Sequence, residues 1–357
     1  MPETSRQHWF GFDYVKGLLL LFVFIGHIIP GKIEENLVRY IIYAFHMPLF
    51  IGVSGFLLNI SKFQNLNYKE ILIKYWNRIV FPWIIAVLVY HLIYHYKTLD
   101  LSLKSLKFLL YDFISPYYHL WYIPGILSYI LISYILFKAF KFSKNKWFYI
   151  IAIAFIISII SKFNILVTYC TFNVTMAEKL LMHIQKTFRL YNFLYFAFGL
   201  YLREKCDKVT LSDKHISISW IIVILSSIIN IFLFFTNNET SQNIFYYFLN
   251  LPLLYILVFY SIKGFYPECK FIEFIGIYSL PIYLYHILCK IFSGIIFLEG
   301  SLQYYVLNVT LFVCLCFTVY FLRKIKCINK FIFGSTNFAL NYTMLQPHNI
   351  SCIYDTF

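Results

Sequence analysis

The amino-acid sequence predicts an all-α protein, a polytopic bundle of about ten transmembrane helices. Of its 357 residues 61% are hydrophobic and only 13% are charged, and the mean hydropathy is +0.70. Average soluble domains carry about 25% charged residues. A soluble protein of this length cannot bury so much apolar surface, because its own surface must face water. The composition therefore excludes an ordinary soluble enzyme, a disordered chain and a small disulfide-linked scaffold.

Ten apolar stretches approach the roughly 20 residues that a helix needs to cross the hydrocarbon core of a membrane. They are residues 14–31, 37–60, 79–96, 118–137, 147–162, 188–202, 216–236, 244–262, 272–297 and 303–322. The fifth and sixth are the shortest. An even number of spans puts both termini on one side. We expect residues 1–330 to form a single transmembrane domain, followed by a C-terminal tail (331–357) that shows no periodicity.

The charged residues predict which side of the membrane each loop faces. The chain has 30 Lys and Arg against 16 Asp and Glu, a net charge of +14. With a cytoplasmic N-terminus, nineteen of the 30 fall in inner segments and nine in outer ones, while Lys16 and Lys290 lie within spans. This bias follows the positive-inside rule, so both termini are expected in the cytoplasm. The alternative, a basic surface for nucleic acid, is unnecessary, and no motif supports it.

The first span carries two ionisable residues, which are costly in lipid and mark a candidate functional site. Lys16 and His27 are eleven residues apart, which is three turns plus about 20°, so they share one helix face about 16 Å apart. Asp13 lies three residues before Lys16 and can pair with it. We expect Lys16 near the cytoplasmic mouth and His27 near mid-membrane.

Two further spans each carry one histidine at a similar depth, His46 and His286, near Pro48 and Pro281. For each of the two, a hydrogen bond to a neighbouring helix remains an alternative to a functional role. A three-histidine metal site is conceivable. The sequence offers no paired spacing for it, so no metal is expected. The eight cysteines form no C-x-x-C pair and are interpreted as apolar fillers.

Two interfacial segments have both a structural and a functional interpretation. Lys74 and Arg78 are four residues apart on one helix face. They either fix the orientation of this helix as basic residues at the cytoplasmic interface, or bind phosphate. His119 and Trp121 belong to an aromatic run at the opposite interface. That run is either an interfacial belt or a surface for stacking sugars.

Together these segments resemble the membrane acyltransferase family 3, over residues 9–325. The matching segments are Lys16 to His27, Phe45–Phe50 with Ser54–Phe56, Arg78 to Pro82, His119–Tyr122 and Gly276–His286. Two positions depart from the family pattern. Lys16 stands where the family usually has arginine. Tyr75 stands at the first position of its paired-arginine motif, with Lys74 beside it as the expected substitute.

The resemblance implies an O-acetyltransferase in the bacterial cytoplasmic (inner) membrane. It implies acetyl-CoA from the cytoplasm as donor. The implied acceptor is a carbohydrate hydroxyl, lipid-linked or polymeric, of an O-antigen, capsule or exopolysaccharide. The alternative function is a transporter or flippase of a lipid-linked sugar or small solute. Such transporters often have broken helices at matching positions of two halves, a pairing that this sequence does not show.

The resemblance also implies roles for the candidate residues. His27 is expected to act as the general base that takes the proton of the acceptor hydroxyl. Lys16, Lys74 and Arg78 are expected to bind the phosphates of the donor, with Asp13 orienting Lys16. Four residues are expected to line the acceptor path from the outer side, namely His46, His119, Trp121 and His286.

Overall fold

The computed structural model describes residues 10–95, 103–163, 183–206, 213–236 and 239–333, and its regular elements in these ranges are helices. Eight helical stretches are long and apolar enough to cross a membrane, which confirms a polytopic helical bundle. They are Gly11–Ile28, Leu37–Phe56, Tyr68–His95, Tyr122–Ala139, Lys214–Thr236, Ser241–Lys263, Ser279–Ile296 and Leu302–Leu322. The fifth and sixth predicted spans are also helical but shorter: α8 (Lys146–Lys162) has 17 residues and α11 (Phe193–Cys206) has 14.

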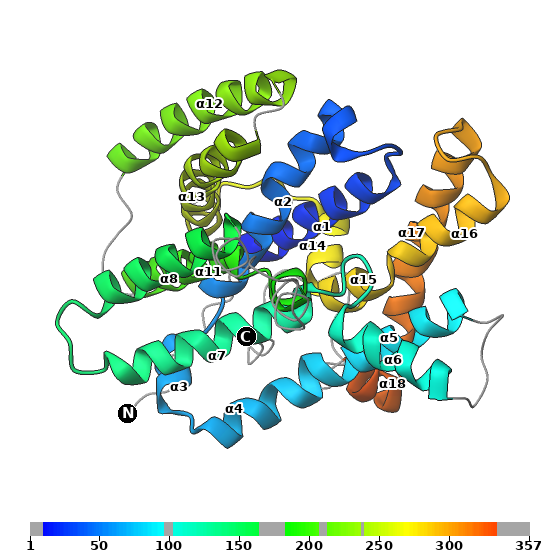
Figure 1. Cartoon of the computed structure of the whole chain (residues 1–357), viewed down its shortest axis with the longest axis horizontal. Coiled ribbons are helices and arrows are strands. Elements are labelled where there is room, and N and C mark those ends of the chain that lie inside the picture. Colours follow the sequence, from blue (N-terminus) through cyan, green and yellow to red (C-terminus); the bar gives the residue numbers. More distant parts are fainter. Residues whose placement is uncertain (1–9, 96–102, 164–182, 207–212, 237–238, 334–357) are drawn as a thin grey trace, which may run out of the picture.

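Helix α1 (Phe10–Ile28) lies near the middle of the bundle (Figure 1). It packs against α2 (Leu37–Phe56), α13 (Glu239–Lys263), α14 (Lys270–Ile277), α15 (Ser279–Tyr285) and α16 (Ile287–Ile296). It ends at Ile28, just before Pro30 and Gly31, where Gly31 has φ +89°. His27 is therefore one residue from the end of α1. The depth of His27 in the membrane stays a prediction, because the end of a helix does not fix where the membrane lies.

The contact between α1 and α14 brings two backbones together. A Cβ atom added to Gly17 would overlap the carbonyl oxygen of Ile272, and one added to Gly276 would overlap that of Asp13. Gly199 of α11 approaches Gly52 of α2 in the same manner. Small residues allow such close packing between helices in a membrane, where van der Waals contact replaces the hydrophobic driving force.

Two of the predicted spans are not single α-helices. Residues 272–297 form α14, α15 and α16, with breaks at Tyr278 and His286. The third predicted span continues back through α4 (Tyr68–Tyr75) and a π-helical turn, η2 (Trp76–Val80), into α5 (Phe81–His95). The remaining helices are α3 (Ile60–Asn65), α6 (Leu103–Ile114), α7 (Tyr122–Ala139), α12 (Asp213–Thr236), α17 (Leu302–Leu322) and α18 (Lys326–Phe331).

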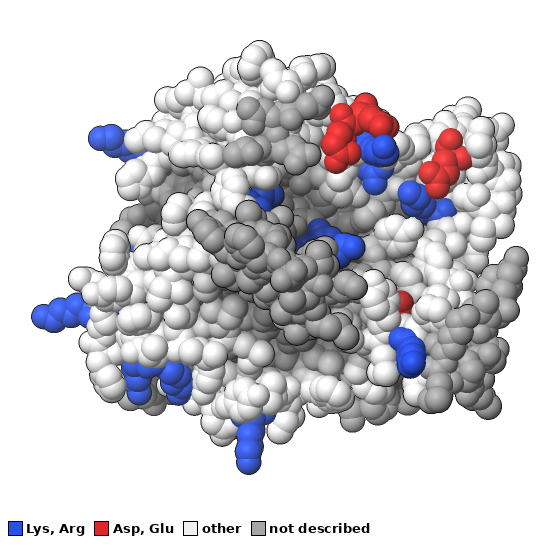
Figure 2. Space-filling view, viewed as in Figure 1, with Lys and Arg blue, Asp and Glu red and all other residues white. Residues whose placement is uncertain are grey.

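Charged side chains are sparse on the face seen in Figure 2. Acidic and basic side chains gather over the start of α2 and the α16–α17 turn, whereas only basic ones lie at the α7–α8 turn (Figure 2). Two ion pairs belong to the mixed region, Lys32–Glu35 at 3.5 Å and Lys290–Glu299 at 3.9 Å. These two regions of the visible face thus differ in charge, and which of them lies toward the cytoplasm stays a prediction.

Candidate active site

Three of the predicted site histidines meet at one place, although they are far apart in the sequence. His27 comes from the end of α1, His119 from the turn before α7, and His286 from the break between α15 and α16. The ring centroids of His27 and His286 are 5.3 Å apart, those of His119 and His286 4.7 Å, and those of His27 and His119 6.3 Å. We refer to these three residues as the histidine cluster.

Two rings of the cluster are oriented by backbone carbonyls. His119 donates from Nε2 to the carbonyl of Leu284 at 3.0 Å, and His286 donates from Nδ1 to that of Tyr283 at 2.7 Å. Because a carbonyl only accepts, each neutral ring keeps a lone pair on its other nitrogen. Nδ1 of His119 and Nε2 of His286 are buried, and neither has a hydrogen-bond partner among the described residues. A buried acceptor without a donor is costly, so these atoms indicate a site for a ligand with hydroxyl or N–H groups.

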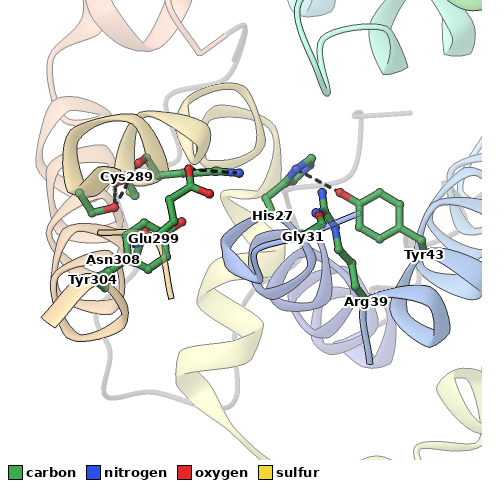
Figure 3. Close-up of polar contacts among 10 residues, drawn as sticks. His27, Gly31, Arg39, Tyr43, Cys289, Glu299, Tyr304 and Asn308 are labelled. Atoms are coloured by element: carbon green, nitrogen blue, oxygen red, sulfur yellow. Dashed lines mark hydrogen bonds and ion pairs between the residues drawn. The ribbon is translucent and has the colours of Figure 1, made fainter. Parts of the chain in front are cut away.

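The third ring, His27, has a side-chain partner that the sequence did not indicate. Its Nδ1 lies 3.2 Å from the hydroxyl of Tyr43, on α2 (Figure 3). When Nδ1 donates to this hydroxyl, Nε2 of His27 is left as the basic nitrogen. Arg39, also on α2, donates to the carbonyl of Gly31, and its guanidinium carbon lies 5.3 Å from the centre of the Tyr43 ring. Arg39 therefore ties the α1–α2 connection to the tyrosine that contacts His27.

The other predicted acceptor residues lie around the cluster. His46 is buried, donates from Nδ1 to the carbonyl of Ile42 at 2.6 Å, and has its ring 5.0 Å from that of Tyr43. Trp121 is only 5% exposed, and the guanidinium carbon of Arg189 lies 4.0 Å from its ring centre. Part of the aromatic surface of Trp121 is therefore already used by a cation–π contact. The sequence did not indicate Arg189, which has a left-handed backbone with φ 44°.

The predicted pair between Asp13 and Lys16 is present in α1. Lys16 Nζ lies 2.9 Å from Asp13 Oδ1, and the two side chains are 8% and 1% exposed. A lysine buried to this extent is stable in its charged form only beside such a counter-charge. The pair lies toward the opposite end of α1 from His27, about 16 Å along the helix axis.

Lys74 and Arg78 lie on the segment that joins α4 to α5. Lys74 ends α4 with its ammonium 5.5 Å from the ring centre of Tyr75, and Arg78 lies in the π-helical turn η2, which packs against α5 and α18. A groove of 630 Å³ opens beside this segment, with almost entirely apolar walls from α4, η2 and α7. π-Helical turns often occur at functional sites, and the apolar pattern of the sequence did not predict this one.

Residues 9–322 match the acyltransferase 3 family, described as an acyltransferase domain. The chain belongs to this family. Membership of this family favours a membrane-bound acyltransferase over the alternative of a transporter. Two curated relatives match short segments of this acyltransferase. Nodulation protein NolL of Sinorhizobium fredii is 42% identical over 53 residues, 13% of this chain and 14% of the relative. Nodulation protein NolL of Mesorhizobium japonicum is 38% identical over 63 residues, which are 16% of this chain and 17% of the relative. No solved structure matches the chain.

Proposed function

We propose that this acyltransferase moves an acetyl group from acetyl-CoA to a hydroxyl of a cell-surface carbohydrate, in the cytoplasmic membrane of a bacterium. The observation that carries the proposal is the histidine cluster, with two buried nitrogens that lack a hydrogen donor among the described residues. A sugar offers several hydroxyl groups close together. Two of them can donate to Nδ1 of His119 and Nε2 of His286 while a third is the nucleophile.

In this mechanism His27 is the general base. The acceptor hydroxyl oxygen attacks the carbonyl carbon of the thioester, and its proton passes to Nε2 of His27. The tetrahedral intermediate then collapses: the carbon–sulfur bond breaks, the ester remains on the sugar, and the departing thiolate takes up the proton from His27. A hydrogen bond from Nδ1 of His27 to Tyr43 holds the ring in the required tautomer.

The donor is proposed to bind toward the other end of α1. Lys16, oriented by Asp13, supplies a positive charge about 16 Å from His27, a separation that suits the pantetheine arm of acetyl-CoA. Lys74 and Arg78 are candidates to bind its phosphates, since ammonium and guanidinium groups are the usual phosphate ligands. His46 and Trp121 are proposed to border the acceptor, close to Tyr43 and Arg189 respectively.

The decisive experiment replaces His27 by alanine. Membranes that contain equal amounts of wild-type or His27→Ala protein receive acetyl-CoA labelled in the acetyl group, and incorporation into the carbohydrate fraction is measured. Loss of a general base lowers the rate by about 100-fold or more. His215→Ala, at an exposed position on α12, is the matched control and should keep full activity. Retention of most activity by His27→Ala, at equal protein level, would show that His27 is not the base.

A further inference from the structure

A second group of metal-ligand side chains lies where α5 meets α6, outside the histidine cluster. His91 and His95 come from α5, and Asp112 comes from α6. One potential ligand atom from each of the three lies within 4.8 Å of the others. His91 Nδ1 is 2.6 Å from Asp112 Oδ2, and His95 Nε2 is 3.9 Å from the same oxygen. No function described above uses these residues.

Among the described residues, no lysine or arginine pairs with the buried carboxylate of Asp112. Its side chain is 6% exposed, and its partners among the described residues are His91, His95 and Tyr117. The hydroxyl of Tyr117 donates to Oδ2 at 2.7 Å and lies 3.0 Å from His95 Nε2. Since that hydroxyl has a single proton, His95 must be the donor toward the tyrosine oxygen. A buried carboxylate is stable when a cation compensates its charge, and imidazoles compensate it only when they are protonated.

We propose that His91, His95 and Asp112 bind a divalent transition-metal ion, Zn²⁺ by preference. Two imidazoles and one carboxylate are a ligand set that suits zinc. His91 and His95 are four residues apart, so their side chains lie on one face of α5. Ligand atoms around tetrahedral zinc are about 3.3 Å apart, close to the 3.9 Å between His95 and Asp112. At His91 the metal replaces the proton that now lies between the ring and Asp112. His91 Nδ1 and Asp112 Oδ2 then move apart from their present 2.6 Å.

The role of this ion is structural. It links α5 to α6, and the hydroxyl of Tyr117, or a water in its place, completes the coordination. The site also adjoins the histidine cluster. Tyr117 precedes His119 by two residues, and Tyr90, next to His91, donates to the same Leu284 carbonyl as His119 does. A metal at this place therefore holds the segment that orients His119. The proposal depends on this geometry and not on the identity of the acyl donor or acceptor.

The test is zinc binding by the full-length protein in detergent, purified through a tag that contains no histidine and then treated with chelator. Calorimetric titration with Zn²⁺ should show one site per chain, and zinc should raise the melting temperature. Asp112→Asn and His95→Gln should each weaken binding by about tenfold or more. Tyr117→Phe keeps the three proposed ligands, and a water can replace its hydroxyl, so it should lose less affinity than either ligand variant.

Two control variants show where the ion binds. His215→Gln, on the surface of α12, and His286→Gln, in the histidine cluster, should bind zinc as the wild type does. Size-exclusion profiles establish that each variant is folded, and His95→Gln keeps the test valid if Asp112→Asn does not fold. The proposal is overturned if the wild type binds no zinc, which would leave only a hydrogen-bonded network. It is equally overturned if folded His95→Gln binds zinc as tightly as the wild type.

Discussion

His27 differs from the other histidines of the cluster in the partner that orients it. His119 and His286 donate to backbone carbonyls, which fixes the proton on one nitrogen of each ring. His27 instead faces the hydroxyl of Tyr43, which can donate or accept. In the proposed mechanism this hydroxyl accepts from Nδ1 of His27, and Nε2 takes up the proton of the acceptor.

The tyrosine partner of His27 leads to a specific prediction. Tyr43→Phe removes the hydroxyl that holds Nδ1 of His27, while the aromatic ring continues to pack beside His46. We expect turnover to fall by about tenfold, less than for removal of the base itself, because orientation is lost and the base remains. The measurement is acyl transfer at saturating donor. An unchanged turnover number would mean that Tyr43 does not orient His27.

The contribution of the buried Asp13–Lys16 pair to stability can be measured separately from the proposed role of Lys16 in donor binding. Lys16→Met alone removes one partner of a buried ion pair and should lower the free energy of unfolding by about 3–5 kcal/mol. The double variant Asp13→Asn, Lys16→Met removes both charges and should regain most of that stability. If Lys16 also binds the donor, the double variant still has a raised KM for acetyl-CoA. A normal KM in this stable double variant would leave the pair a purely structural role.

Single residues could be predicted from the sequence only when the signal was local. The eleven-residue spacing of Lys16 and His27 lies within one helix, and so does the pairing of Asp13 with Lys16, which the structure contains. The contacts of Tyr43 with His27 and of Arg189 with Trp121 join different segments, and one sequence has no local signal for them. His91 and His95 are four residues apart on one helix, but Asp112 comes from another helix, so one sequence has no local signal for this group.

Helix α1 is held at the core of the molecule through glycine contacts with α14. Gly276→Ala would force a methyl group against the Asp13 carbonyl, so the two helices must separate. Such overpacking should cost about 1–3 kcal/mol of stability and lower activity, because α1 carries both Lys16 and His27. Thermal unfolding in detergent, followed by acyl-transfer assays, measures both effects.

The matched control for this substitution is Gly294→Ala in α16. A methyl group there meets only the flexible carboxylate of Glu299, at 3.7 Å. It should be neutral or slightly stabilising, because alanine favours helix over glycine. Equal stability of Gly276→Ala and Gly294→Ala would contradict the close approach of α1 and α14.

The helices were more predictable than the places where they end or break. All ten apolar stretches are helical, since hydrophobic length is the dominant requirement in a membrane. The breaks at Tyr278 and His286 and the π turn at Trp76–Val80 depend on packing between segments, whereas α1 ends at a local signal, Pro30 and Gly31. The local sequence, read for hydrophobicity alone, does not show how neighbouring helices compensate for freed backbone groups.

At the scale of the whole molecule, the charge distribution predicts which end faces the cytoplasm. Glu35 lies in the mixed acidic and basic region before α2, and Phe142 lies among lysines at the α7–α8 turn, where it is 92% exposed. We expect a membrane-impermeant maleimide applied to intact cells to label Glu35→Cys and not Phe142→Cys. The wild-type protein, with its natural cysteines, provides the background. Labelling of Phe142→Cys alone would reverse the orientation.

The contact between α1 and α14 also restricts the route by which a long, narrow substrate can reach His27. Their backbones touch at Gly17 and Gly276, so nothing as wide as a methylene chain fits between them there. If the donor binds at Lys16 as proposed, its thioester arm must therefore pass along another flank of α1, where α2, α13, α15 and α16 are the neighbours. Bulky side chains introduced on those flanks should obstruct the donor. The glycine contact leaves no space for the donor between α1 and α14.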